Sequence, residues 1–139
     1  MNFLLDTNVI SEPSKPWPNK GVMAWLAAVN EDSVFLSVVT ITELRYGIER
    51  LTAEKHRRRL DEWLGGELTA RFQGRILPID VDVADACGRL VARSESHGRP
   101  MEPRDAFIAA TAEVHGLTLV TRNASDFEAI VKDILTPWN

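Results

Sequence analysis

Four acidic residues, far apart in the sequence, stand where their carboxylates could act together. Asp6 directly follows a short apolar run, Glu43 and Asp126 come after two other such runs, and Asp105 lies in the proline-led segment that begins at Pro103. If the apolar runs form a parallel sheet, the segments that follow its strands meet at one edge, where ligands bind in such folds. We therefore expect Asp6, Glu43, Asp105 and Asp126 to converge at that edge.

A cluster of carboxylates indicates a particular chemistry. Carboxylates that lie close together repel one another, so they need a cation or must hold some of their protons. Mg²⁺ prefers oxygen ligands and usually keeps several waters, which leaves positions for a phosphate and an attacking water, and Mn²⁺ accepts similar ligands. The four acids thus predict metal-dependent hydrolysis of a phosphodiester.

Each acid also has a plainer structural explanation. Thr40 to Glu43 matches a capping box, and Asp105 suits the first turn of a helix, where it would complement the helix dipole. Asp80 follows an apolar run as well, but it opens the next helical stretch, so we interpret it as a helix cap. Asp6 is harder to explain in this way, because it closes a strand that is predicted to be buried on both faces of a parallel sheet.

Apolar periodicity predicts an α/β fold with a parallel sheet. Short β-branched runs alternate with longer stretches of helical period, as expected for βαβ units. We expect strands at 2–5, 34–38, 75–79, 117–121 and, more weakly, 133–136. Helices are predicted over Val81 to Arg93, over Pro103 to His115, and over Thr52 to Ala70 with an interruption at Gly65-Gly66. The helix from Pro103 runs back along the sheet, which brings Asp105 to the same edge as Asp6.

Length and composition limit the possibilities further. The 139 residues fit a single domain, and 45% hydrophobic with 26% charged residues is typical of a globular protein. A net charge of -4 argues against binding nucleic acid through a broad basic surface. The first residues carry no basic leader and Asp6 interrupts their apolar run, so we expect a cytoplasmic protein without a membrane segment. The lone cysteine, Cys87, is expected to be a buried apolar residue.

Taken together, these segments resemble PIN-domain ribonucleases of the VapC toxin type, including the FitB-like proteins. The resemblance spans essentially the whole chain. It is carried by Leu4-Leu5-Asp6-Thr7-Asn8-Val9-Ile10-Ser11-Glu12, Ser37-Val38-Val39-Thr40-Ile41-Thr42-Glu43-Leu44-Arg45-Tyr46-Gly47, Asp105-Ala106-Phe107-Ile108-Ala109-Ala110-Thr111-Ala112 and Leu119-Val120-Thr121-Arg122-Asn123-Ala124-Ser125-Asp126-Phe127. The order and separation of these motifs are more specific than any one of them.

The resemblance implies a three-layer α/β/α fold with a parallel sheet in the order 3-2-1-4-5, a single PIN domain over residues 1–139, and an Mg²⁺-dependent ribonuclease. It implies that Asp6 and Asp105 are the direct metal ligands, with Glu43 and Asp126 completing the acidic site. Asn123 stands where many PIN domains carry an acid, so either Asn123 or Asp126 could face the metal. It also implies a homodimer, a toxin of a toxin-antitoxin pair, and a VapB-like antitoxin that covers the active site.

Two other classes of protein are compatible with parts of this pattern. A receiver-like signalling domain also collects acids and Mg²⁺ at the carboxyl edge of a parallel sheet, but it needs a pair of acids after the first strand, where Asp6 is alone. A catalytically inactive PIN-like module that binds RNA or a protein partner is the other alternative, and the complete set of four acids argues against it. Arg104 and Arg122 adjoin motif acids, but solvated or salt-bridged arginines are the commoner outcome.

Overall fold

Five short parallel strands form one sheet at the centre of the molecule. The computed structural model describes all 139 residues. The strands are β1 (Phe3–Leu5), β2 (Val34–Ser37), β3 (Ile76–Leu77), β4 (Thr118–Val120) and β5 (Ile134–Leu135), in the spatial order β3-β2-β1-β4-β5. Every neighbouring pair is parallel. This is the order 3-2-1-4-5 that the resemblance implies, and it differs from the order 2-1-3-4-5 of receiver-like folds.

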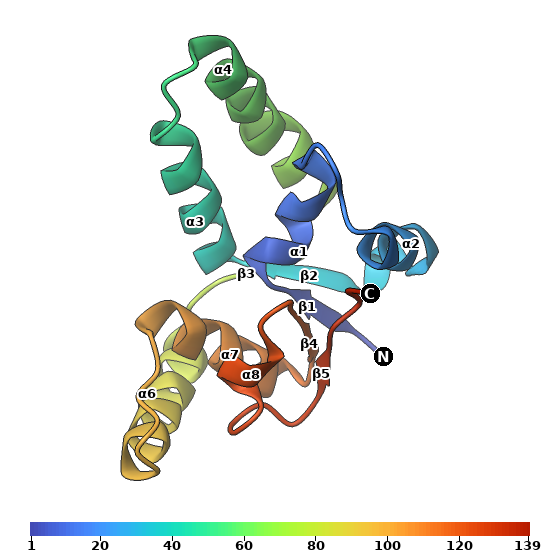
Figure 1. Cartoon of the computed structure of the whole chain (residues 1–139). Helices are drawn as coiled ribbons and strands as arrows, with labels where there is room; N and C mark the ends of the chain where they lie inside the picture. The colour runs from blue at the N-terminus through green and yellow to red at the C-terminus, as the bar shows by residue number, and fades with distance from the viewer.

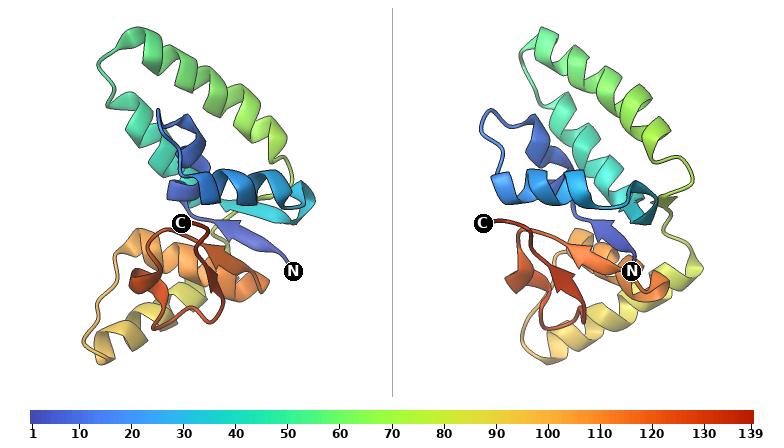
Figure 2. Two further views of the ribbon diagram at one scale, coloured as in Figure 1. Left: turned by 45° about the vertical axis from the view of Figure 1, so that its right-hand side comes forward. Right: turned by 90° about the vertical axis from the view of Figure 1, so that its right-hand side faces the viewer.

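Helices cover both faces of this sheet (Figures 1 and 2). Helices α1 to α5 lie on one side, and α6, α7 and α8 lie on the other. The helices are α1 (Thr7–Ser11), α2 (Lys20–Ala28), α3 (Val38–Glu49), α4 (Glu54–Glu62), α5 (Thr69–Arg71), α6 (Val81–Ser96), α7 (Pro103–His115) and α8 (Ala124–Phe127), with helical turns η1 (Glu12–Ser14), η2 (Glu31–Ser33) and η3 (Trp63–Leu68). The predicted three-layer α/β/α arrangement is therefore confirmed.

Successive side chains of the central strand pack against opposite helical layers. Leu4 packs with the apolar face of α6 and α7, whereas Leu5 packs with residues of α1, α2 and η3. This alternation follows from the pleat of a strand, whose side chains point to opposite faces, and it explains why β1 reads as a continuous apolar run. Cys87, on α6, belongs to the first of these clusters and is buried, as expected. None of the helices is long and apolar enough to span a membrane.

Several predicted boundaries need correction. The edge strands are shorter than expected: β3 covers only Ile76–Leu77 and β5 only Ile134–Leu135, because each has a hydrogen-bonding neighbour on one side alone. The glycine pair Gly65-Gly66 does not interrupt the helical segment. It lies inside η3, a stretch of π-helix that continues directly from α4 into α5. Helix α7 begins and ends as predicted, and Gly116 closes it in the left-handed conformation that favours glycine.

The last residues of the chain pack against the start of α2. Asn19 caps this helix through its side-chain oxygen, which accepts hydrogen bonds from Gly21 N and Val22 N. The amide nitrogen of the same side chain donates to Asn139 O at 3.0 Å. A Cβ atom at Gly21 would lie 2.3 Å from Pro137 O, so only glycine permits this close approach.

We therefore expect Gly21→Ala to lower the free energy of unfolding by about 1–3 kcal/mol, the usual cost of an overpacked site. Gly88→Ala is the matched control, because a Cβ at Gly88, inside α6, meets nothing within 4 Å. It should raise stability by up to about 1 kcal/mol through helix propensity. Urea unfolding of the three proteins measures both effects, and equal behaviour of the two variants would contradict the close packing at Gly21.

Candidate active site

Asp6 lies at the end of the central strand and is held on both sides. Its backbone N–H donates to Val120 O at 2.9 Å, which extends the pairing of β1 with β4 by one residue. Its Oδ1 accepts from Thr7 N, so the side chain caps α1, and its Oδ2 accepts from the Thr121 hydroxyl at 2.8 Å. Because Asp6 is only 8% exposed, these contacts fix the direction of its carboxylate.

A small polar network links the ends of β1 and β4. Asn8 Nδ2 lies 3.4 Å from Asp6 Oδ2, and Asn8 Oδ1 accepts from Arg122 N. On the other side, Thr121 Oγ1 accepts from Asn123 N at 3.1 Å while donating to Asp6. Asn8 is a site residue that the sequence did not predict. Its partner, Arg122, lies 114 residues away along the chain. Only the occurrence of polar residues directly after several strands could have indicated the contact.

Glu43 reaches the site from α3. The capping-box interpretation of Thr40 to Glu43 is wrong, because α3 already begins at Val38 and is capped by Ser37, whose Oγ accepts from Val39 N. Glu43 therefore lies within the helix, where its side chain is 22% exposed and 3.4 Å from Arg104 Nη1. Burial raises the pKa of Glu43, and the charge of Asp6 adds to this, whereas hydrogen bonding by Thr7 and the charge of Arg104 act in the opposite direction.

The charges of the other three acids affect the pKa of Asp105. It occupies the first turn of α7 and does not cap the helix. Burial, followed by the negative charges of Asp6, Asp126 and Glu43, raises the pKa of Asp105 to about 6, and Arg104 counteracts only part of this. The four carboxylates therefore do share one electrostatic environment.

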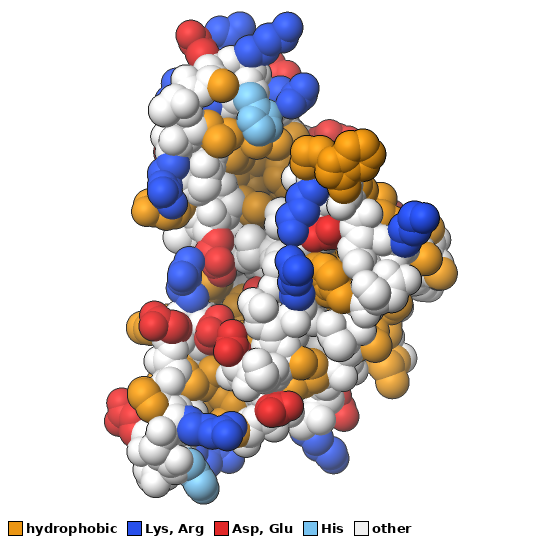
Figure 3. Space-filling model, in the orientation of Figure 1, with side chains coloured by type: hydrophobic (Ala, Val, Ile, Leu, Met, Phe, Trp, Pro, Cys, Tyr) orange, Lys and Arg blue, Asp and Glu red, His pale blue; other side chains and the backbone are white.

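The acids are nevertheless less tightly gathered than the sequence led us to expect. Figure 3 shows acidic side chains around a hollow between α3 and the layer of α7 and α8, with basic side chains beside them. No group of three or more acidic, histidine or cysteine side chains is close enough to hold a metal ion as it stands. Glu43 is instead paired with Arg104, whose Nη1 lies 3.4 Å from Glu43 Oε2.

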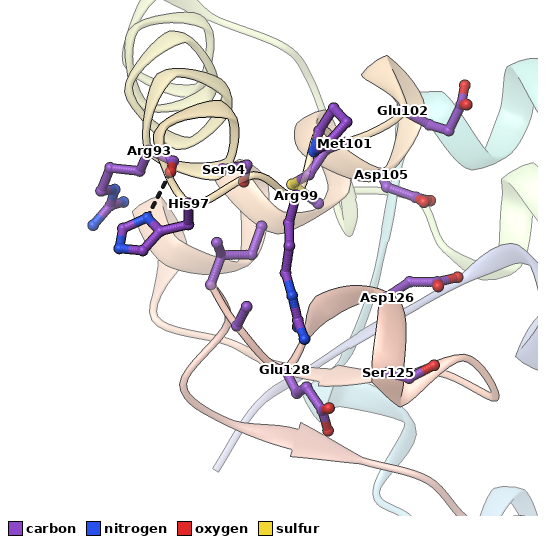
Figure 4. Close-up of a pocket in the computed structure, with 13 residues that line it drawn as sticks. Arg93, Ser94, His97, Arg99, Met101, Glu102, Asp105, Ser125, Asp126 and Glu128 are labelled. Carbon is purple, nitrogen blue, oxygen red and sulfur yellow. Dashed lines mark hydrogen bonds between the residues drawn. The ribbon is translucent and has the colours of Figure 1, made fainter.

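Asp126 belongs to this group by position. It lies in the first turn of α8, and it lines the same cavity as Asp105, with both side chains pointing in the same direction (Figure 4). Asn123 precedes α8 and its side chain does not cap the helix. Asp80 is not part of the site: it caps α6, with its Oδ1 accepting from Val83 N at 3.0 Å, as our interpretation of it predicted.

These residues offer a divalent cation a suitable set of donors. Mg²⁺ is usually bound by one or two carboxylates and keeps several of its waters, so it needs no closed cage of protein ligands. Asp6 is fixed in direction, and the pKa of Asp105 is raised because burial, followed by the charges of the neighbouring acids, disfavours its ionised form. A divalent cation would remove that penalty, so the donor set fits the metal.

The comparisons with known proteins agree with this architecture. The sequence-family model of the PIN domain matches residues 3–132 of this chain. The chain is 40% identical to VapC ribonuclease Y4jK of Sinorhizobium fredii, with 98% of this chain and 97% of the relative covered, and 41% identical to toxin FitB of Neisseria gonorrhoeae, with 99% of each covered.

Solved structures agree as well. The crystal structure of FitAcB from Neisseria gonorrhoeae superposes with a TM-score of 0.94 at 41% identity, covering 99% of both chains. A toxin-antitoxin complex from Klebsiella pneumoniae superposes with a TM-score of 0.72 at 26% identity, again covering 99% of both chains. The chain therefore belongs to the PIN-domain family, in the group that contains the VapC ribonucleases and the FitB toxin.

Proposed function

We propose that this member of the VapC group hydrolyses RNA phosphodiester bonds with Mg²⁺ and acts as the toxin of a toxin-antitoxin pair. Asp6 and Asp105 are the proposed direct ligands of the metal, and Glu43 and Asp126 complete the acidic site. One observation carries this assignment: Asp6 is fixed at the end of the central strand by Thr7 N and the Thr121 hydroxyl, and Asp105, whose pKa is raised by burial and by the charges of Asp6, Asp126 and Glu43, shares its electrostatic environment. Mn²⁺ should be able to replace Mg²⁺.

Each of the proposed site residues has a separate role in hydrolysis. Asp6, held by Thr121, provides a fixed carboxylate at the end of the central strand. Glu43 orients the attacking water and accepts its proton, a task for which a raised pKa is suited. A metal held by Asp6 and Asp105 would supply positive charge at the scissile phosphate and would make the attacking water more acidic. Arg104, which lies beside Glu43, is placed to attract the phosphate toward the acids.

The relatives also support a proposal about partners. One is named toxin FitB, and one solved neighbour is a toxin-antitoxin complex. We infer that this chain pairs with a small VapB-like antitoxin that covers the acidic site, and that the chain itself forms a homodimer. Both expectations can be checked by light scattering of the chain alone and with its cognate partner. Cytoplasmic localisation stays a prediction.

Cleavage of RNA by the purified chain tests the proposed function. Total cellular RNA should be cut in the presence of Mg²⁺ or Mn²⁺ and left intact in EDTA, and sequencing of the new ends should show 5′-phosphates. Thermal unfolding gives a second readout, because an ion that binds only the folded protein raises the unfolding midpoint. Metal binding without any cleavage would favour the alternative of a catalytically inactive PIN-like module, and the absence of both would refute the metal site.

Thr121 offers a test of how Asp6 is positioned. Thr121→Val keeps the shape of this fully buried side chain but removes the hydroxyl that donates to Asp6 Oδ2 and accepts from Asn123 N. We expect kcat to fall about 10- to 100-fold, because a misplaced metal ligand costs on the order of 1–3 kcal/mol of transition-state stabilisation. Thr121→Ser, which restores the hydroxyl, should recover most of the rate. Equal rates for the two variants would show that the bond to Asp6 has no part in catalysis.

A further inference from the structure

A cavity of about 870 Å³ opens directly beside the acidic site (Figure 4). It is bounded by the last turn of α6, the loop that leads to α7, and α8. Its volume lies within the range of about 300–1,000 Å³ that is usual for small-molecule sites. Asp105 and Asp126 belong to its lining, so a molecule held at these acids would continue into the cavity.

Ser94 gives this cavity an unused polar group. The residue lines the cavity and is only 3% exposed, and its hydroxyl oxygen has no hydrogen-bond partner in the protein. Buried hydroxyls without a partner are costly and uncommon in native proteins. Ser96, two residues further along α6, differs: it is exposed and its hydroxyl donates to Arg93 O. The isolation of Ser94 indicates a partner that the protein itself does not supply.

Charge is divided between the two ends of the cavity. In Figure 4 the carboxylates of Asp105 and Asp126 lie at one end, and the side chains of Arg93 and His97 lie at the other. Arg99 extends from the α6–α7 loop across the cavity toward α8, and its guanidinium forms no ion pair. An anion that enters beyond Asp105 and Asp126 therefore meets the guanidinium of Arg99, which has no ion pair although Glu128 also lines this part of the cavity.

We propose that this cavity binds one nucleotide of the RNA strand, next to the bond that is cut. The inference rests on the proposed function and names a subsite for its substrate. The base packs against the apolar part of the lining, which includes Met101 and Ile130, and the Ser94 hydroxyl bonds to a polar edge of the base or to the ribose. Arg99 pairs with the phosphate that follows the nucleotide. In a single RNA strand, phosphates alternate with bases. One phosphate can therefore lie at the acids, the next base against the apolar wall, and the following phosphate at Arg99.

Binding of nucleoside 5′-monophosphates tests this subsite without requiring cleavage. Backbone amide spectra of the ¹⁵N-labelled chain in Mg²⁺ should show shifts at Ser94, Arg99 and Met101 when at least one of the four monophosphates is added. Inorganic phosphate alone should leave Ser94 and Met101 unmoved. Ser94→Ala should weaken binding about 2- to 12-fold, the value of one hydrogen bond, while the unfolding midpoint of the free protein stays the same or rises. Ser96→Ala is the matched control and should bind as the wild type does.

Arg99 separates the phosphate contact from the base contact. Arg99→Gln should weaken the monophosphate about tenfold and leave the corresponding nucleoside unchanged, and Arg99→Lys should recover part of the loss. In cleavage assays both Ser94→Ala and Arg99→Gln should raise KM more than they lower kcat. If no monophosphate shifts the cavity residues while the chain still cuts RNA, the subsite is refuted and the nuclease stands. If monophosphates bind there but RNA is never cut, the proposed function fails and the nucleotide site remains.

Discussion

Asp6→Asn is expected to reduce the rate of RNA cleavage at least about a thousandfold. The substitution keeps the size of the side chain, and the amide oxygen of asparagine can still accept the hydrogen bond from Thr7 N that caps α1. It removes a negative charge from the proposed metal site, where the ion provides several kcal/mol of transition-state stabilisation, and each 1.4 kcal/mol or so corresponds to a factor of ten. Initial rates in saturating Mg²⁺, together with thermal unfolding curves, measure the loss of activity and the retention of the fold.

Asp80→Asn is the matched control for this experiment. Asp80 also follows a strand of the sheet and also caps a helix, through its Oδ1 and Val83 N. It follows β3 at the edge of the sheet, however, whereas Asp6 follows the central strand. The control variant should cleave RNA at the wild-type rate. If Asp6→Asn keeps more than a tenth of the wild-type rate, or if Asp80→Asn loses activity to the same extent, the assignment of Asp6 is wrong.

Asp105→Asn should abolish cleavage and, at neutral pH, make the folded protein more stable. The pKa of Asp105 is raised in the folded state from 3.8 to about 6, so the folded chain binds more protons than the unfolded chain between these values. The contribution of this group to stability therefore falls as the pH rises through that window, and above it the folded state carries the full repulsion. Removing the charge relieves this repulsion, so the variant gains folding stability and loses activity.

The size of this effect is limited by solvent, because Asp105 is only half-buried, and by the loss of a favourable charge in the first turn of α7. We expect a gain on the order of 1 kcal/mol at pH 7.5, or roughly 2–4 °C in the unfolding midpoint for a domain of this size. At pH 4 the difference from wild type should shrink. Thermal unfolding in EDTA at the two pH values measures both predictions.

Asp82→Asn serves as the control for Asp105→Asn, because Asp82 occupies the first turn of α6 and is exposed. It should show no gain in stability. Excess Mg²⁺ should then raise the midpoint of the wild type more than that of Asp105→Asn, since only the wild type keeps both proposed ligands. A lower midpoint for Asp105→Asn than for wild type at pH 7.5 would contradict the repulsion that we ascribe to the four acids.

The sequence was sufficient where local pattern and global position agree. The apolar run of β1 and the proline-led start and glycine end of α7 predicted both elements well, and with them the approach of Asp105 to Asp6. Thr40 was misinterpreted because its match to a capping box competes with a better-placed cap at Ser37, which depends on where β2 ends. Gly65-Gly66 suggested a break, yet the helix widens into a π-helical segment and continues.

The contacts that shape the site were not accessible from local pattern. The bond from Thr121 to Asp6 spans 115 residues, and the pairing of Arg104 with Glu43 spans 61. Helix or strand periodicity cannot predict contacts between residues so far apart in the sequence, because both contacts depend on the order of strands in the sheet. The pairing of Glu43 with Arg104 likewise depends on how α3 and α7 pack, which residue types alone do not determine.

The order of the site residues along the chain has a consequence for synthesis. Asp6 is synthesised 115 residues before Thr121, whose hydroxyl fixes the direction of its carboxylate, and β4 must pair with β1 before the acids meet. A nascent chain that lacks β4 thus has neither the complete sheet nor the complete set of carboxylates. The site can therefore form only after β4 has been made and has paired with β1.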